Sequence, residues 1–429
     1  MIIGREKNRL YLKTTLDNGL RLITSTMPHS RSVSICVFLA VGSRYEAEAE
    51  AGISHFIEHL FFKGTPKRAT SRDIAVAIEG VGGILNAATD RELTLYWCKV
   101  TPNHLPLALD VLADILLHSK LDPEEIERER NVIFEEIHAI KDSPYQQVGL
   151  LIDGLLWPDH PLGRDVAGNV ESVSAITREM MVDFRANRYL PSNAVIAVAG
   201  DIQQEGVVDA VNEVFGGWNG QHQAAGYLAY EEGANPRLRV ENRDTEQTHL
   251  CLALPGLPLK HPKRYTLDLM NTVLGEGMSS RLFVEIRDKL GLAYSIHSYT
   301  EHLYDTGALV ISAGVEHDKL PVAVKAILKQ LALLRESVSE SELTKAKELS
   351  KGRLLLRMED SRSVAGWIGG QEILTNEILS VDEVMSIVDA ITAEQVAEIA
   401  QELLVEDRLR LAVVGPTKEG KKLEQLLRI

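Results

Sequence analysis

The chain has 429 residues, of which 45% are hydrophobic and 25% are charged, and these fractions are ordinary for a soluble globular protein. It is too long for one ordinary hydrophobic core, so we expect two domains. The formal net charge of -15 argues against a nucleic-acid partner, because phosphate binding needs clustered lysine and arginine, and no apolar stretch approaches the roughly 20 residues of a membrane helix.

Strand-like and helix-like segments are mixed along the first half of the chain. Strand-like composition is found in residues 19–27, 32–42 and 93–100. Residues 105–118 and 122–140 are predicted helices, and the second opens with Asp122 as N-cap and Pro123 at the first helical position. Strands mixed with amphipathic helices predict an α+β sandwich, with a mainly antiparallel sheet covered by helices.

The second half of the chain repeats the first at a constant offset. Similar segments lie 215 positions apart at four places, which pair Cys36 with Cys251, Leu105 with Leu320, Ile176 with Ile391, and Ala194 with Leu409. This period is too long for a solenoid and predicts two tandem copies of one domain fold. We expect an N-terminal domain over residues 1–218, a linker rich in Gly, Ala and polar residues over 219–239, and a homologous C-terminal domain over 240–429.

The cysteines and the N-terminus bear on the cellular compartment. The three cysteines lie in apolar runs without CxxC spacing, which argues against disulfides and against a cysteine zinc cluster. The N-terminus has no apolar segment of the kind found in signal peptides. We therefore expect buried, reduced thiols and a reducing compartment, most simply the cytoplasm.

The segment HFIEH, residues 55–59, places two histidines and a glutamate within an apolar stretch. In a helix, His55 and His59 leave the same face one turn apart, so both imidazoles can reach one ion. Glu58 lies on the same side, where a carboxylate can hold the attacking water without binding the metal. The H-x-x-E-H spacing is that of the inverted catalytic zinc motifs, although a core helix with satisfied polar groups is the plainer alternative.

A third zinc ligand is expected from another element, because catalytic zinc sites usually have three protein ligands and a water. Glu129 and Glu136 lie seven residues apart on one face of the predicted helix, and Glu135 is rotated from Glu136 by about 100°. We predict Glu136 as the ligand and Glu129 as a supporting carboxylate. His138 points roughly opposite to Glu136 and is expected to be structural or at the surface.

The chain resembles the pitrilysin-like zinc peptidases, in the short two-domain form similar to mitochondrial processing peptidase. The family pattern is H-x-x-E-H, 69 residues, a Glu, six residues and a second Glu, and the spacing from His59 to Glu129 and Glu136 matches it in full. Other segments also look like family segments in both halves of the chain, among them DNGLRLI, VGSRYE and HPLGRDVAG in the first half and GMSSRLFVEIRDKLGLAYS in the second, so the similarity covers nearly the whole chain.

The resemblance implies a zinc-dependent endopeptidase with one Zn²⁺ per chain. His55, His59 and Glu136 would hold the ion, Glu58 would be the general base, and Glu129 would support the site. Shifted by 215 positions, the H-x-x-E-H and Glu136 positions fall on residues that do not suit zinc, namely Met270, Val273, Leu274 and Lys351. The second copy therefore cannot hold zinc at the equivalent place.

The resemblance also implies where substrates bind. Arg287 and Tyr294 fit the spacing of a family pair that binds substrate and helps to stabilise the developing oxyanion. The segment around Asn86 and Ala87 resembles an edge strand to which an extended substrate adds by main-chain hydrogen bonds. The acidic run of residues 45–52 is expected to be a solvated loop or a helix start.

Family members of this length pair as dimers that enclose a chamber. The implied assembly is a homodimer, or a heterodimer with a related subunit, that admits peptides or unfolded polypeptides. One alternative is a non-catalytic structural or partner subunit of the same family, although such subunits typically lack the metal motif. The other is a zinc-free α+β binding module, which would make the spacing match a coincidence.

Overall fold

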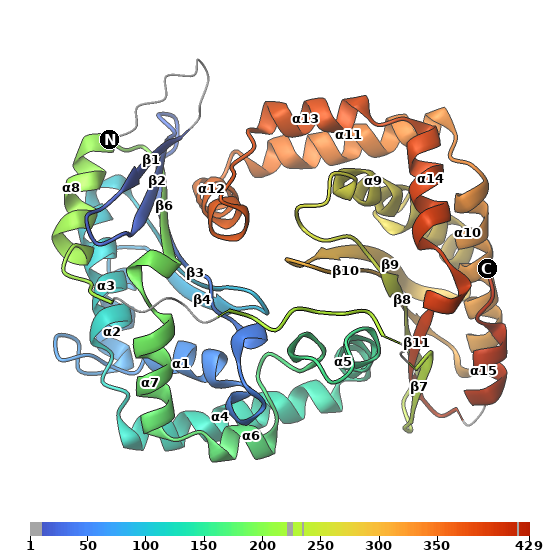
Figure 1. Ribbon diagram of the computed structural model, residues 1–429, viewed down its shortest axis with the longest axis horizontal. Coiled ribbons are helices and arrows are strands. Elements are labelled where there is room, and N and C mark those ends of the chain that lie inside the picture. The colour runs from blue at the N-terminus through green and yellow to red at the C-terminus, as the bar shows by residue number, and fades with distance from the viewer. Residues whose placement is uncertain (1–10, 221–225, 234–235, 418–419) are drawn as a thin grey trace. The chain divides into compact units, whose positions relative to one another are not determined.

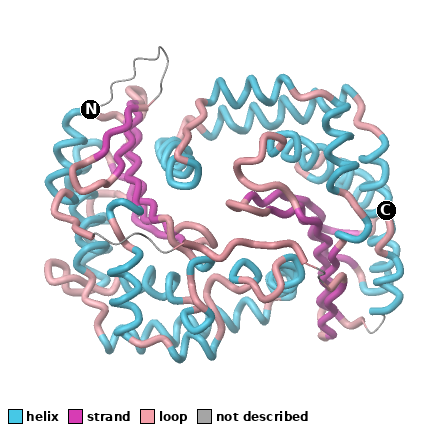
Figure 2. The backbone as a smooth tube through the Cα atoms, viewed as in Figure 1, coloured by secondary structure: helices cyan, strands magenta, loops and turns pink. Residues whose placement is uncertain are grey.

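The computed structural model describes residues 11–220, 226–233, 236–417 and 420–429. The chain divides into two compact units, and each unit draws on three separate stretches of sequence. Figure 1 gives the order of the elements by colour, and Figure 2 shows the strands in magenta and the helices in cyan. Unit 1 consists of Met1–Ile137, Asp165–Leu228 and Leu355–Ser380, and unit 2 of His138–Arg164, Ala229–Leu354 and Val381–Ile429.

The described residues of unit 1 form a sheet of six strands in the order β1-β2-β6-β3-β5-β4. Strands β2 and β6 are parallel, and the other neighbouring strands are antiparallel. The sheet ends at β4, which pairs with β5 on one side. The strands are β1 (Leu12–Thr15), β2 (Arg21–Thr26), β3 (Val33–Leu39), β4 (Ile84–Thr89), β5 (Thr94–Val100) and β6 (Ala194–Gly200).

Helices cover both faces of the unit 1 sheet. Side chains alternate between the two faces along each strand, so neighbouring residues of one strand belong to two different cores. In β3, Ile35 and Val37 belong to the larger core, whereas Cys36 and Phe38 pack in a second core that contains residues of α12 (Ser361–Thr375). The larger core takes residues from α1 (Ile53–Phe61), α2 (Ser71–Glu79), α3 (Leu105–His118), α4 (Pro123–Asp142), α6 (Val170–Ala175), α7 (Arg178–Arg188) and α8 (Gln204–Phe215).

The described part of unit 2 has a sheet of five strands in the order β7-β11-β8-β10-β9, in which β7 and β11 are parallel. Helix α5 (Pro144–Leu156) shares a buried core with residues of β8, β10 and β11. The strands are β7 (Leu238–Asn242), β8 (Thr248–Pro255), β9 (Ala293–His302), β10 (Gly307–Val315) and β11 (Arg410–Gly415). The other helices are α9 (Arg264–Gly275), a π-helix (Phe283–Lys289), α10 (Leu320–Glu336), α11 (Glu340–Arg357), α13 (Val381–Ala390), α14 (Ala393–Leu403) and α15 (Gly420–Leu426).

The fold class and the internal duplication are confirmed. The strand order β2-β6-β3-β5-β4 of unit 1 corresponds to β7-β11-β8-β10-β9 of unit 2. Helices α3 and α10 begin at Leu105 and Leu320, the same 215 positions apart that the sequence comparison gives. Each half therefore contributes a mainly antiparallel sheet with helices packed against it.

One helix of each half packs on the sheet of the other half. Helix α5 comes from the first half and lies on the unit 2 sheet, whereas α12 comes from the second half and lies on the unit 1 sheet (Figure 1). The compact units consequently do not coincide with the predicted domains 1–218 and 240–429 and the predicted linker 219–239. Those bounds describe the repeat in the sequence, and they stay a prediction. Residues 221–225 and 234–235 of the predicted linker lie outside the described residues.

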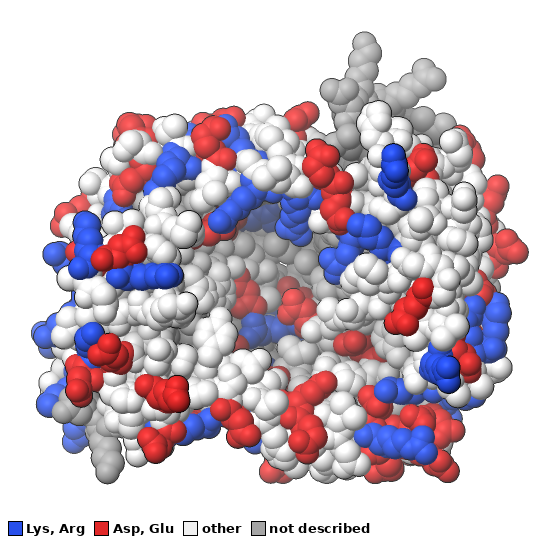
Figure 3. Space-filling model, turned by 180° about the vertical axis from the view of Figure 1, so that it is seen from behind, with Lys and Arg blue, Asp and Glu red and all other residues white. Residues whose placement is uncertain are grey.

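Several expectations from composition can be compared with the structure. None of the described helices combines the length and the apolar character that a bilayer-crossing helix requires. Cys36, Cys98 and Cys251 are buried and free, and burial raises the pKa of each thiol to about 12. Figure 3 shows acidic and basic side chains interspersed over the visible face, without a continuous basic surface there.

Candidate metal centre

Helix α1 carries the HFIEH segment, and its amphipathic pattern decides which side chains face away from the core. Phe56, Ile57 and Leu60 are almost fully buried, whereas His55 and His59 keep 18% of their side-chain surface exposed. The apolar residues fix the helix on the unit 1 core. The two imidazoles are consequently left together on the side of the helix that is open to a ligand.

The start of α1 is stabilised by a carboxylate from the preceding loop. The N-cap residue Gly52 has no side chain to offer and adopts a left-handed conformation with φ 95°. Glu46 is 4% exposed, and its carboxylate accepts hydrogen bonds from the backbone N–H groups of Gly52 and Ser54, each at 2.8 Å. A carboxylate at this position satisfies free N–H groups and suits the positive end of the helix dipole.

Both parts of the expectation for residues 45–52, a solvated loop or a helix start, apply to different residues of the run. Glu48 is exposed and lies in a short 3-10 turn, but Glu46 is buried as a helix cap. Sequence reasoning missed this residue because it lies six positions before Gly52, well outside the local N-cap pattern.

Helix α4 brings the predicted third ligand to the two histidines. The Nε2 atoms of His55 and His59 are 3.2 Å apart, and the Oε2 atom of Glu136 lies 3.8 and 3.7 Å from them. In a tetrahedral site with Zn–ligand bonds of about 2.0–2.1 Å, ligand atoms are separated by about 3.3 Å. The three predicted donor atoms therefore lie close to the spacing that one zinc ion requires.

The chemistry of this donor set also suits zinc. Two imidazole nitrogens and one carboxylate oxygen leave a fourth position for water, as in catalytic zinc sites. Among the described residues, this is the group of side chains able to hold a metal ion whose donor atoms lie within 4.8 Å of one another. Glu135 and His138 are exposed and do not belong to the group, in agreement with their expected orientation.

The electrostatics of the site favour a neutral imidazole at His55. Burial and the neighbouring His59 lower the pKa of His55 to about 4, so that His55 is uncharged near neutral pH. Metal ligands must be deprotonated, and a neutral histidine satisfies that condition. The other ring nitrogen of His55, Nδ1, is buried and has no hydrogen-bond partner among the described residues.

Glu129 contacts the ring nitrogen of His59 that is not among the three donor atoms. Its Oε2 atom lies 3.1 Å from Nδ1 of His59, and its Oε1 atom lies 2.5 Å from Nζ of Lys63. Carboxylates in this position fix the tautomer and orientation of a metal-binding histidine. Sequence reasoning missed Lys63, which lies two residues beyond the end of α1, where helical spacing no longer says which way a side chain points.

Glu58 lies beside the donor triad and within hydrogen-bonding distance of β4. Burial raises its pKa, and a hydrogen bond from the hydroxyl of Thr89 to Oε2, at 3.0 Å, partly opposes that rise. A raised carboxyl pKa brings the group closer to the operating range of a general base. The predicted base, Glu58, is therefore next to the donor atoms, and its carboxylate is hydrogen-bonded to a residue of β4.

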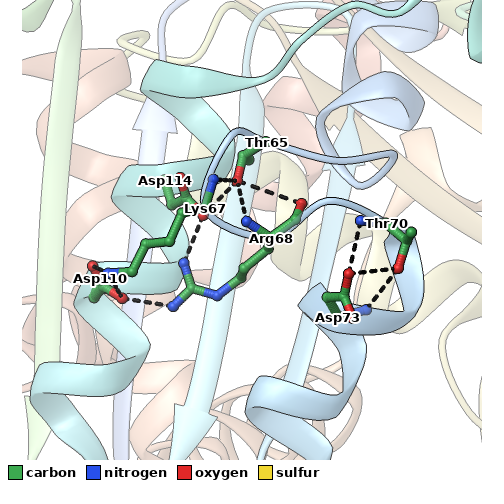
Figure 4. Close-up of polar contacts among 7 residues, drawn as sticks. All are labelled: Thr65, Lys67, Arg68, Thr70, Asp73, Asp110 and Asp114. Atoms are coloured by element: carbon green, nitrogen blue, oxygen red, sulfur yellow. Dashed lines mark hydrogen bonds and ion pairs between the residues drawn. The ribbon is translucent and has the colours of Figure 1, made fainter.

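The residues that follow α1 are anchored on α3 (Figure 4). The guanidinium of Arg68 contacts Asp110 and Asp114, each at 2.6 Å, and the hydroxyl of Thr65 donates to Asp114 at 2.8 Å. Arg68 is 9% exposed and Asp114 is 4% exposed, so this ion pair is buried, whereas Asp110 is partly exposed and also pairs with Lys67. The cluster fixes the C-terminal end of the histidine-bearing helix against the core.

Asn86 and Ala87 lie on β4, the outermost strand of the unit 1 sheet. Asn86 is exposed, and its side-chain oxygen accepts a hydrogen bond from the N–H group of Ala87 at 2.8 Å. No strand of the described residues pairs with the outer edge of β4, and such an edge can accept another extended chain. A role of these two residues in substrate binding stays a prediction.

Arg287 and Tyr294 lie together in unit 2. Arg287 belongs to the π-helix, and its guanidinium carbon lies 5.2 Å from the ring centre of Tyr294, which is 77% exposed on β9. The structure thus brings the two predicted residues into contact with each other. Their role towards substrate stays a prediction.

The equivalent positions of unit 2 hold no metal-binding set. Met270, Val273 and Leu274 are buried in α9, and Lys351 on α11 makes ion pairs with Glu348 and Asp389 at 2.8 and 2.7 Å. Three apolar side chains and a paired lysine therefore stand where unit 1 has its histidines and glutamates.

Comparison with known protein families gives two matches. The family described as "Insulinase (Peptidase family M16)" matches residues 21–169, and the one described as "Peptidase M16 inactive domain" matches residues 175–350. The first range contains both histidines and all three glutamates of the candidate site, and the second contains Arg287 and Tyr294.

Similar proteins and structures extend over nearly the whole chain. Proteins named "uncharacterized zinc protease" include one from Mycobacterium leprae, 38% identical over 97% of this chain and 94% of the relative, and one from Bacillus subtilis, 37% identical over 94% and 98%. The crystal structure of a protease from Helicobacter pylori has a TM-score of 0.90 at 24% identity and covers 95% of this chain and 99% of its own. A structure titled as a peptidase M16 inactive domain from Pseudomonas fluorescens has a TM-score of 0.88 at 20% identity, with 95% and 98% covered.

Proposed function

We propose that this chain, which belongs to peptidase family M16, the insulinase family, is a zinc-dependent endopeptidase for peptides or unfolded polypeptides. The observation that carries the proposal is the meeting of three donor atoms, from His55, His59 and Glu136, next to the half-buried carboxylate of Glu58. In this proposal the three residues hold one zinc ion per chain. When bound, zinc would act as a Lewis acid that lowers the pKa of water and polarises the scissile carbonyl.

Glu58 performs the proton transfers in the proposed mechanism. Its carboxylate accepts a proton from the attacking water while the water oxygen bonds to the carbonyl carbon of the substrate. The same proton then passes from Glu58 to the leaving amine nitrogen as the C–N bond breaks, which returns the carboxylate to its ionised form. The raised pKa of Glu58, caused mainly by burial, supports this double role, because it makes the carboxylate a stronger proton acceptor than an ordinary glutamate.

The remaining residues would bind and orient the substrate. An extended peptide would add to the edge of β4 around Asn86 and Ala87 through main-chain hydrogen bonds, which fits tolerance of many side chains. Arg287 and Tyr294 would bind substrate and stabilise the oxyanion that develops on the scissile carbonyl. Glu129 would keep His59 oriented for the metal.

The assembly and location are also part of the proposal. We expect a dimer, either of two copies or with a related subunit, that encloses a chamber admitting unfolded chains and excluding folded proteins. The buried free thiols support a reducing compartment, most simply the cytoplasm. Light scattering on the active protein should give the mass of a dimer, and a stable active monomer would contradict the chamber.

The central experiment is turnover of an unbiased peptide library by the purified protein. Cleavage sites are mapped by mass spectrometry, with and without a chelator, while bound zinc is measured by atomic emission. We expect about one zinc per chain, internal cleavage, loss of cleavage with chelator and recovery with added zinc. Absence of both bound zinc and chelator-sensitive cleavage would contradict the proposal and favour a non-catalytic partner subunit.

A further inference from the structure

A single hydrogen bond joins the candidate base to the edge strand of the unit 1 sheet. The hydroxyl of Thr89 donates to Oε2 of Glu58 at 3.0 Å, in a partly buried setting. Among the described residues, Thr89 is the hydrogen-bond partner that the structure gives to this carboxylate. The bond occupies one carboxylate oxygen and leaves the other, Oε1, available to accept a proton.

The alternation of side chains along β4 directs Thr89 towards α1. Leu85, Ala87 and Thr89 are half-buried, whereas Ile84 and Asn86 on the other face are exposed. Leu85 and Ala87 pack against the unit 1 core, which also contains the apolar residues of α1. Thr89, the last residue of the strand, therefore points to the same side, where Glu58 lies.

A short loop segment fixes both ends of this contact. The N–H groups of Ser43 and Arg44 donate to the carbonyls of Asp90 and Arg91, at 3.2 and 2.9 Å, and so fix the turn that follows Thr89. The guanidinium of Arg44, which is 1% exposed, lies 2.5 Å from the carboxylate of Glu92 in the same turn.

The same loop then reaches the helix that carries the base. Glu46, two residues after Arg44, caps the first turn of α1 with two hydrogen bonds of 2.8 Å. Gly42 lies so close to the turn that an added Cβ atom would come within 2.1 Å of the carbonyl oxygen of Asp90. Residues 42–46 therefore fix the β4–β5 turn and α1 relative to each other, and with them the positions of Thr89 and Glu58.

We propose that Thr89 is a positioning residue for the general base, which joins the strand that receives the substrate to the carboxylate that activates water. A glutamate side chain has several rotatable bonds, and a base is effective only when it stays within hydrogen-bonding distance of the proton it removes. Thr89 restricts this freedom and keeps its own proton throughout the reaction. The proposal rests on the proposed function, in which Glu58 is the base and β4 binds the substrate.

Two substitutions at Thr89 distinguish the contribution of its hydroxyl group from the contribution of its side-chain shape. Thr89→Val keeps the branched shape and removes the donor, whereas Thr89→Ser keeps the donor and removes a methyl group. For Thr89→Val we expect kcat to fall about 10- to 100-fold, the size of effect that misplacement of a reacting group produces, with KM and zinc content unchanged. Thr89→Ser should stay within about threefold of the wild-type kcat, because hydroxyl donors of this kind are interchangeable.

The chain offers a matched control in the same hairpin. Thr94 lies directly opposite Thr89 in the β4–β5 pairing, and its buried hydroxyl donates to the carbonyl of Val41 at 2.8 Å. Thr94→Val removes a hydrogen bond to Val41 and none to Glu58, so we expect lower thermal stability and a smaller loss of kcat than in Thr89→Val. Equal loss of kcat in the Thr94 and Thr89 valine variants would show a general structural effect and overturn the proposal.

Crystal structures of the zinc-loaded variants give a readout that does not depend on turnover. We expect Glu58 in one conformer in the wild type and in Thr89→Ser, and in a shifted or multiple conformer in Thr89→Val. An unchanged Glu58 conformer in Thr89→Val, or a kcat loss in Thr89→Ser as large as in Thr89→Val, would overturn the positioning role. Failure of the proposed function is recognised separately, by the absence of chelator-sensitive cleavage in the wild type.

Discussion

In unit 1, helix α1 presents two histidines and a glutamate beside a carboxylate from α4, whereas in unit 2 the corresponding helix α9 presents Met270, Val273 and Leu274 to its own core. The corresponding position on α11 is Lys351, which is paired with Glu348 and Asp389. The strand order and helix positions are nevertheless shared. The comparison teaches that one duplicated fold accommodates either a polar donor set or an apolar core on the same helix face.

The pKa of a partly buried histidine is shifted in opposite directions in the two units. In unit 1, burial and the neighbouring His59 lower the pKa of His55, which leaves a neutral donor nitrogen. In unit 2, burial alone would lower the pKa of His302, but the hydrogen bond and the charge of Asp268 raise it above its usual value. The difference arises from the partner that each histidine meets, because a carboxylate favours the charged ring and a second imidazole disfavours it.

The largest expected effect comes from removing the carboxylate donor of unit 1. Glu136→Gln should abolish zinc binding and peptidase activity, with a loss of zinc affinity beyond the roughly 10- to 100-fold that is typical for a supporting residue. Glu135→Gln changes the adjacent, exposed carboxylate on the same helix and should retain both properties. Zinc titration and peptide turnover measure the two variants, and equal zinc affinity in both would remove Glu136 from the ligand set.

The next effect separates chemistry from metal binding. Glu58→Gln keeps the size of the side chain and its contact with Thr89, but an amide cannot accept the water proton. We expect the zinc content to be unchanged and kcat to fall about 10²- to 10⁴-fold, the usual contribution of a general base. A variant that cleaves peptides at the wild-type rate would show that the base is another group.

A substitution in unit 2 tests whether its apolar helix face accepts a polar donor. Leu274→His introduces at the position equivalent to His59 an imidazole that would be almost fully buried, since Leu274 is 0% exposed. We expect no additional zinc and a loss of roughly 2–4 kcal/mol in the free energy of unfolding, because an unpaired polar group replaces a packed side chain. Urea denaturation and zinc content measure both outcomes, and a gain of bound zinc would contradict the comparison.

A smaller effect is expected from the lysine that supports Glu129. Lys63→Met should weaken zinc affinity by less than the roughly 10- to 100-fold expected for Glu129→Gln, because it acts through Glu129 and not directly on His59. Lys67→Met is the matched control, since Lys67 is more exposed and pairs with Asp110 on α3. Equal zinc affinities in the two lysine variants would show that Lys63 has no influence on the site.

The smallest expected effect is a pH dependence in unit 2. His302 contacts Asp268 at 3.0 Å and the carbonyl of Leu257 at 2.7 Å, and its pKa is raised from 6.5. The folded state therefore binds the proton more tightly than the unfolded chain, so this stabilisation is complete below 6.5 and is lost as pH rises through the folded-state pKa. The difference in unfolding free energy between the wild type and His302→Gln should shrink as the pH rises above 6.5.

The control for this pH dependence is His138→Gln, because His138 is exposed on α4. Its unfolding free energy should follow that of the wild type across the same range. A wild-type advantage over His302→Gln that grows with pH would reverse the sign that the Asp268 contact requires.

The sequence predicted the candidate donors well because helical periodicity is local. Positions four apart on α1, and seven apart on α4, face one direction whatever the rest of the fold does. The family pattern then fixed which glutamate of α4 meets the histidines, and Glu136 does lie beside them. That the three donors bind zinc stays a proposal that the experiments above address.

The sequence did not predict the supporting contacts of the site. Glu46 caps α1 from a loop, Lys63 reaches Glu129, and Thr89 reaches Glu58 from a neighbouring strand. An acidic loop residue, a lysine near a helix end and a threonine in a strand are all common at the surface, so none of them gives a signal in the sequence. These contacts depend on how separate elements pack, which periodicity does not describe.

The packing of α5 on the unit 2 sheet and of α12 on the unit 1 sheet could not be predicted from the sequence either. An amphipathic pattern indicates that a helix buries one face, but it does not say which of two similar sheets receives that face. Because the halves are duplicates, each sheet offers an apolar surface of the same kind to either helix. Packing specificity therefore decided the composition of each unit.

By itself, the order of amino acids determined that this protein has two copies of an α+β sandwich and that one copy carries an inverted metal motif. These properties follow from repeats and from spacings along single helices, which short stretches of chain record completely. Only the tertiary structure decided how distant residues such as Thr89 and Glu46 support that motif, and which sheet each exchanged helix covers. The physical reason is that such contacts arise from the packing of whole elements, where burial and shape complementarity select among partners that look alike in the sequence.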